Sequence, residues 1–234
     1  MNFAANQSLR DEMLAACRLL THFRIVEGFG HVSARIAGSE RLLITPRRAL
    51  GLVTDAELVE IDPEGRPLGD NRNPPLELSM HLAVYRRRTD VKAIVRGHPR
   101  NVAAYACAGE PLRVAHGFGA NLGSVVPVVG EPYLVTNLEM GEAVAEALAG
   151  REAVILRTNG MLAVGQSVAH ACVQALFLEE TAEVQLLAQA AGMNPRFYSA
   201  EEAARRHGDD RALEPLRAWE YYRAVAEAKI TAIR

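Results

Sequence analysis

The stretches GFGHVSAR at residues 28–35 and LLITP at residues 42–46 decide the fold class. Both are rich in apolar and β-branched residues, and the turn-forming segment Gly38-Ser39-Glu40 separates them. This pattern predicts a β-hairpin with strands at 31–36 and 41–45. A third strand is expected at 58–62, where the turn Pro63-Glu64-Gly65 ends another short apolar run.

Outward from this hairpin, the chain alternates irregularly between helical and extended patterns. Apolar residues recur at helical spacing in five segments: 8–26, 77–87, 100–108, 138–149 and 168–191. Further strands are expected at 91–98, 153–157 and 161–164, and the charge-rich tail from about residue 200 is expected to be helical. Because helices mix with hairpins and no linker or repeat interrupts the chain, residues 1–234 are predicted to form one layered α+β or α/β/α domain.

The composition excludes several classes of protein. With 26 Lys+Arg against 28 Asp+Glu, the net charge of −2 gives no field that would attract nucleic acid or an anionic membrane. No apolar run is long enough for a transmembrane helix and no signal peptide is recognised, so a cytoplasmic location is expected. The three cysteines are widely spaced, which predicts buried reduced thiols. Neither a P-loop nor a GxSxG elbow is present.

More motifs follow the hairpin in a fixed order: PPLE at 74–77, HLAVYR at 81–86, VKAIVRGHP at 91–99 and NGMLAVG at 159–165. Over about residues 10–190 this order resembles the class II aldolase/adducin superfamily, which includes fuculose-phosphate aldolases. The resemblance implies an α/β fold, a three-layer α/β/α sandwich with a central mixed, largely antiparallel sheet. It also implies a homo-oligomer, usually a tetramer.

The metal site of the aldolases is altered in this chain. In the family, a glutamate is followed by a His-x-His pair nineteen residues later and by a last histidine 61 residues after that pair. Here the matching residues are Glu77, Arg96-Gly97-His98 and Asn159. Residues i and i+2 of a strand share a face, so Arg96 and His98 should point together. Because a guanidinium repels a cation, the usual zinc site is predicted to be absent and the cofactor is unknown.

The phosphate contacts of the sugar-phosphate members are altered too. Where the family has Gly-Asn, Thr-Gly and Ser-Ser, this chain has Gly30-His31, Arg47-Arg48 and Pro75-Leu76. Two arginines can hold a carboxylate by bidentate hydrogen bonds, although they could equally form a solvated turn. His31 replaces an asparagine that touches substrate in the family. His116 lies in a loop that the family places near the cleft.

The resemblance implies a carbon–carbon lyase, and these replacements predict that it acts on a small unphosphorylated hydroxy-carboxylate or aromatic carboxylate. The reaction would be decarboxylation or aldol cleavage. Glu77 would be the acid/base, and Arg96 with His98 would take the electrophilic role of the metal. Five residues are predicted to bind substrate: His31, Arg47, Arg48, His116 and Asn159.

Three alternatives stay open. Arg96 and His98 could be a surface pair on an edge strand. The chain could be a catalytically silent association module, as adducin heads are. It could also be a metal-dependent sugar aldolase whose atypical ligands come from Glu77, His98, His116 and His31. A small carboxylate is the expected partner, with neither nucleic acid nor membrane.

Overall fold

The computed structural model describes residues 3–70, 73–207 and 213–231. Its main sheet has eight strands: β1 (His31–Arg35), β2 (Leu42–Ile44), β3 (Val59–Ile61), β4 (Pro67–Leu68), β5 (Ala93–Gly97), β8 (Val128–Val129), β9 (Ala153–Leu156) and β10 (Met161–Gly165). Their order is β4-β3-β2-β1-β5-β10-β9-β8. Every neighbouring pair is antiparallel except β8 and β9, so the sheet is mixed and largely antiparallel, as expected. The strands β6 (Leu112–Arg113) and β7 (Val125–Val126) form a separate pair.

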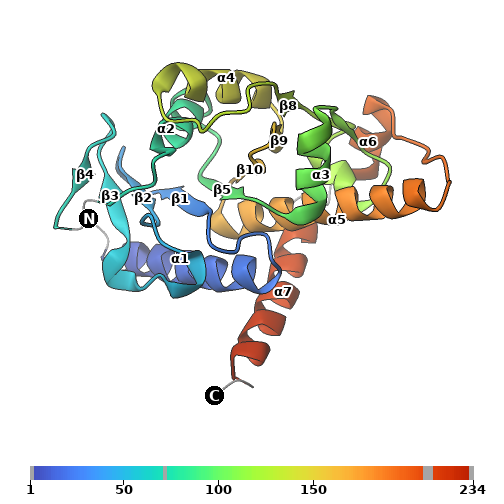
Figure 1. The fold of residues 1–234 in the computed structure, drawn as a ribbon. Helices are drawn as coiled ribbons and strands as arrows, with labels where there is room; N and C mark the ends of the chain where they lie inside the picture. Colours follow the sequence, from blue (N-terminus) through green and yellow to red (C-terminus); the bar gives the residue numbers. More distant parts are fainter. Residues whose placement is uncertain (1–2, 71–72, 208–212, 232–234) are drawn as a thin grey trace.

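Helices cover both faces of the sheet (Figure 1). On one face lie α2 (Leu78–Arg87) and α4 (Leu138–Leu148). The other face is covered by α1 (Phe3–His22), α3 (Arg100–Ala108) and α5 (Val168–Ala190), and α7 (Leu213–Thr231) packs against α1 and α5. Neighbouring strand residues alternate between the two cores: Ile94 packs into one and Val95 into the other. This period of two confirms the three-layer α/β/α arrangement.

Strand β5 lies in the middle of the sheet, between β1 and β10. The alternative that Arg96 and His98 sit on an edge strand is therefore wrong. Register places Arg96 opposite His31 on β1 and opposite Leu162 on β10. The C-terminal end of β5 and the start of β1 thus meet at one place.

Several expected boundaries need correction. The first helix, expected at 8–26, begins at Phe3 and ends at His22, and Arg24 just beyond it has a positive φ of 57° that ends helical geometry. The helical tail consists of α6 (Ala200–His207) and α7, while residues 208–212 and 232–234 of that expectation lie outside the described residues. Cys17 and Cys172 are buried, but Cys107 is exposed on α3. Among the described helices, none is long and apolar enough to cross a membrane.

Candidate active site

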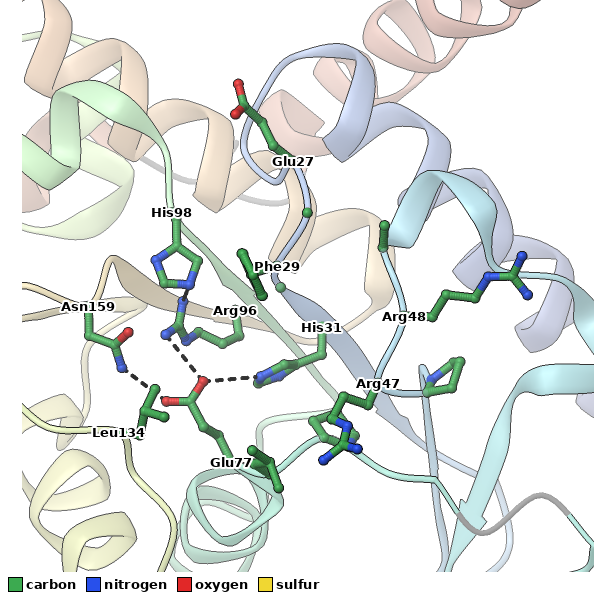
Figure 2. Close-up of a pocket in the computed structure, with 16 residues that line it drawn as sticks. Glu27, Phe29, His31, Arg47, Arg48, Glu77, Arg96, His98, Leu134 and Asn159 are labelled. Carbon is green, nitrogen blue, oxygen red and sulfur yellow. Dashed lines mark hydrogen bonds and ion pairs between the residues drawn. The ribbon is translucent and has the colours of Figure 1, made fainter.

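A pocket of about 760 Å³ opens where β1 and β5 meet the N-terminus of α2 (Figure 2). This volume suits a small-molecule ligand. Seven of the eight predicted site residues line it: His31, Arg47, Arg48, Glu77, Arg96, His98 and Asn159. The sheet register and the turn after β9 thus bring together residues that are far apart in the sequence.

Glu77 is the residue on which the polar contacts converge (Figure 2). Its Oε1 accepts hydrogen bonds from Asn159 Nδ2 at 3.0 Å and from the Val135 amide at 3.3 Å. Its Oε2 lies 3.2 Å from Arg96 Nη2 and 3.4 Å from His31 Nε2. Burial alone would raise the pKa of Glu77, but its contacts with His31 and Arg96 lower this pKa to about 2. Glu77 is therefore a carboxylate at neutral pH.

Arg96 is a fully buried cation next to this carboxylate, with 0% of its surface exposed. Its Nη1 donates to His98 Nε2 at 2.6 Å and to the Gly97 carbonyl at 3.1 Å. Burial and then the charge of Arg96 lower the pKa of His98 to about 4, so the ring is neutral at pH 7. Since Nε2 accepts from Arg96, the single proton of the neutral His98 ring resides on Nδ1.

Two glycines allow the backbone to approach closely around these side chains. Gly30 has a φ of +140°, and a Cβ there would lie 2.9 Å from the Arg96 carbonyl oxygen. Gly160 has a φ of +77°, and a Cβ there would lie 2.1 Å from the Gly97 carbonyl oxygen. Only glycine fits both the backbone conformation and the space at these positions. They bring His31 and Asn159 up to the end of β5.

The residues present do not fit the zinc of the sugar-phosphate aldolases. The Arg96 guanidinium lies between Glu77 and His98, so a permanent cation stands beside both remaining ligand positions (Figure 2). Within the described ranges, no cluster of three or more histidine, cysteine, aspartate or glutamate side chains could hold a metal.

His116 is the one predicted site residue that does not line this pocket. Its Nε2 lies 3.8 Å from Glu180 Oε1, and its ring packs edge-to-face on Phe118. The atypical ligand set of Glu77, His98 and His116 is therefore not assembled within this chain.

The mouth of the pocket is exposed and mixes apolar with basic side chains. Phe29 is 80% exposed, and Leu76 and Leu134 are also exposed. Arg48 forms an ion pair with Glu57. Arg47 is exposed and lines the mouth, and its guanidinium has no hydrogen-bonding or ion-pair partner among the described residues.

Sequence reasoning missed part of the site. His81 is fully buried, and its Nε2 lies 2.7 Å from His31 Nδ1. Ser33 and Tyr85 continue this set of contacts, and the Val135 amide donates to Glu77. The spacing of His31 to Ser33 on one strand, and of His81 to Tyr85 on one helix, was the available signal, because each pair shares a face.

Comparisons with known proteins identify the family. Residues 11–186 match the family model described as Class II Aldolase and Adducin N-terminal domain. The chain is 35% identical over 203 residues to 3,4-dihydroxyphthalate decarboxylase of Terrabacter sp. (strain DBF63), covering 81% of this chain and 84% of that protein.

Solved structures agree with this assignment. An aldolase II superfamily protein from Pseudomonas syringae has a TM-score of 0.83 at 25% identity, covering 96% of this chain and 94% of that one. L-fuculose 1-phosphate aldolase from Glaciozyma antarctica PI12 has a TM-score of 0.80 at 25% identity, covering 94% of this chain and 89% of that one. The chain therefore belongs to the class II aldolase and adducin family.

Proposed function

We propose that this chain is a carbon–carbon lyase that decarboxylates a small, unphosphorylated aromatic carboxylate with a ring hydroxyl next to the carboxyl group. The observation that carries the proposal is the ionised Glu77 at the base of a pocket whose mouth holds an exposed guanidinium, Arg47, and an exposed aromatic ring, Phe29. A carboxylate base, an anion contact and an apolar rim match the three chemical parts of such a substrate.

The relative from Terrabacter supports this choice. Its name describes a decarboxylase of a dihydroxylated aromatic dicarboxylate, and the match covers most of both chains. The positions that contact phosphate in sugar-phosphate aldolases carry Arg47-Arg48 and Pro75-Leu76 here. Loss of the hydroxyl groups disfavours a phosphorylated sugar, while the arginines favour a planar carboxylate.

The chemistry follows from the charge state of Glu77. Glu77 takes the proton of the ring hydroxyl, and the resulting oxyanion increases electron density on the ring. The proton then passes from Glu77 to the ring carbon that bears the carboxylate. The bond to the carboxylate breaks and CO₂ leaves, while its electron pair returns through the ring to the oxygen. Water gives a proton to the ring oxygen and restores the hydroxyl, and the hydroxide that remains combines with the released CO₂ as bicarbonate. Glu77 ends as a carboxylate.

Arg96 has a different role from the one expected from sequence. Its guanidinium has no exposed surface, so it reaches a substrate through Glu77 and His98 rather than by contact. Its fixed positive charge keeps Glu77 ionised and offsets the negative charge that develops beside it. His98, which lines the pocket, and Asn159, which donates a hydrogen bond to Glu77, complete the predicted site.

The test is CO₂ release from 3,4-dihydroxyphthalate and other hydroxylated aromatic carboxylates. Phthalate is the matched control because it has no hydroxyl proton for Glu77 to remove. We expect turnover of hydroxylated substrates and none of phthalate. Cleavage of a sugar phosphate without any CO₂ release would overturn the proposal.

A silent association module is the second candidate, because both Glu77 oxygens already have two contacts each, as in a structural ion pair. It predicts no turnover by the wild-type protein of any carboxylate in the panel.

Assembly into a homotetramer and a cytoplasmic location stay predictions from the sequence. Light scattering at micromolar concentration tests the first, and a monomer would contradict it.

A further inference from the structure

A chain of buried polar side chains runs from Glu77 into the core between β1 and α2. His31 Nδ1 lies 2.7 Å from His81 Nε2, and His81 Nδ1 lies 2.7 Å from Ser33 Oγ. Ser33 Oγ in turn lies 2.9 Å from the Tyr85 hydroxyl. All four side chains are buried, with exposed fractions between 0 and 7%. Such a network is costly to bury unless every group is satisfied.

Strand and helix periodicity explain why these four residues meet. His31 and Ser33 are two apart on β1 and therefore project from the same face. His81 and Tyr85 are four apart on α2 and lie one turn above each other. The helix α2 packs on this face of the sheet (Figure 1). The hydrogen bonds His31–His81, His81–Ser33 and Ser33–Tyr85 then alternate between strand and helix.

At the end near the pocket, the charge of Glu77 sets the direction of donation. A carboxylate only accepts, so the His31 nitrogen that faces it, Nε2, carries the proton. Burial lowers the pKa of both His31 and His81, so each ring is neutral and has one donor and one acceptor nitrogen. His31 Nδ1 therefore accepts from His81 Nε2.

The far end requires the same direction. Because His81 Nε2 donates, its Nδ1 accepts from the Ser33 hydroxyl. Within the described part of the chain, Ser33 is the hydrogen-bond partner of the Tyr85 hydroxyl, and burial raises the pKa of Tyr85, so this hydroxyl is protonated and donates to Ser33. The reverse order would leave the Tyr85 proton without an acceptor and turn a His31 lone pair toward Glu77.

We propose that His81, Ser33 and Tyr85 are positioning residues that hold His31 as its Nε2–H tautomer, so that His31 keeps Glu77 oriented as a proton acceptor. This role rests on the proposed function of Glu77. The tautomer of a histidine is set by the partner of its other nitrogen, and supporting residues of this kind typically contribute about 10- to 100-fold to activity. This series of hydrogen bonds does not carry protons to or from solvent, because the side chain at its far end, Tyr85, is only 4% exposed.

The first measurement is independent of activity. Histidine ¹⁵N spectra of the wild-type protein should show both His31 and His81 as neutral Nε2–H tautomers, assigned with His31→Gln and His81→Phe. In Ser33→Ala the donor to His81 is lost, and the Nε2–H population of both rings should fall. Nδ1–H tautomers in the wild type, or spectra unchanged by Ser33→Ala, would overturn the proposal even if no substrate is known.

The second measurement is kinetic. Ser33→Ala should lower kcat by about 10- to 100-fold with KM unchanged, and Tyr85→Phe should have a smaller effect because the Ser33–His81 bond remains. Thr45→Val is the matched control. The buried Thr45 hydroxyl accepts a hydrogen bond from the Val32 amide at 3.0 Å and takes no part in the hydrogen bonds between His31 and Tyr85. We expect Thr45→Val to lose stability and keep its kcat. Equal kcat values for Ser33→Ala and Thr45→Val would contradict the positioning role.

Discussion

The base and the mouth of the pocket are built in different ways. At the base, Glu77 and Arg96 are buried. Glu77 stands at the N-terminus of α2 and is held by Arg96 and His31 from the sheet and by Asn159 from the turn after β9. At the mouth, Phe29 and Arg47 are exposed and lie on loops. Within one pocket, one set of groups is fixed by sheet register and the other is free to adapt.

This difference assigns separate tasks to the two regions. Groups that move protons must be held to within a fraction of an ångström, which buried hydrogen bonds achieve. Groups that select a substrate can tolerate motion, and loop positions vary at little cost to the fold. Substitutions at the base should therefore change kcat and stability, whereas substitutions at the mouth should change KM.

The largest expected effect is that of Glu77→Gln. The amide cannot accept the substrate proton, so kcat should fall by about 10²- to 10⁴-fold. Glu57→Gln, which alters the carboxyl that pairs with Arg48, is the control and should retain kcat. Steady-state CO₂ release measures both, and a Glu77→Gln enzyme that turns over at the wild-type rate would show that the acid/base is elsewhere.

Arg96→Met should weaken both the fold and the reaction. Removing one member of a buried ion pair leaves an unpaired buried charge, so the free energy of unfolding should fall by about 3–5 kcal/mol. Without the guanidinium, burial should raise the pKa of Glu77, and the acid limb of the pH–rate profile should move to higher pH. Denaturant titration measures the stability loss, and the pH–rate profile measures the shift. An acid limb that does not move would mean that Arg96 does not set the pKa of Glu77.

At the mouth, Arg47 and Arg48 form a matched pair. Arg47→Gln should raise KM by about tenfold, because a charge-assisted hydrogen bond contributes about 1.5–3 kcal/mol and part of this is screened at an exposed site. Arg48 is already engaged with Glu57, so Arg48→Gln should raise KM less. If Arg47→Gln lowers kcat and leaves KM unchanged, the division between base and mouth is wrong.

The smallest effect concerns stability against pH. The pKa of His98 is about 4 in the folded chain, below its ordinary value of 6.5, so between these values the unfolded chain binds a proton that the folded chain does not. Stability should therefore fall as pH drops from 6.5 toward 4. His98→Gln should reduce this pH dependence of stability without abolishing it, because the buried histidines also contribute to it. Thermal melts at pH 7 and pH 5 measure it, and an unchanged dependence in His98→Gln would contradict the assigned shift.

Much of the fold could be predicted from the sequence. The hairpin around Gly38, the strand that carries Arg96 and the helix after Glu77 follow from short-range patterns of apolar residues and turns. The position of β5 in the middle of the sheet could not be predicted in this way, because strand order depends on contacts between distant segments.

Site residues that stand at motif positions could be predicted from the sequence. Those whose position depends on how distant segments pack together could not. Glu77, Arg96, His98 and Asn159 stand at motif positions, and the structure brings them together. The placement of His116 beside Glu180 depends on how a loop packs against α5. The burial of His81 depends on how α2 rotates toward β1.

The most direct test is turnover by chelator-treated enzyme whose metal content is measured in the same sample. Because the Arg96 guanidinium lies where it repels a divalent cation, we expect less than about one-tenth equivalent of zinc, manganese or iron, with CO₂ release and melting temperature unchanged by the chelator. Near-stoichiometric metal that the chelator removes, with turnover lost and then restored by that metal, would contradict the role assigned to Arg96.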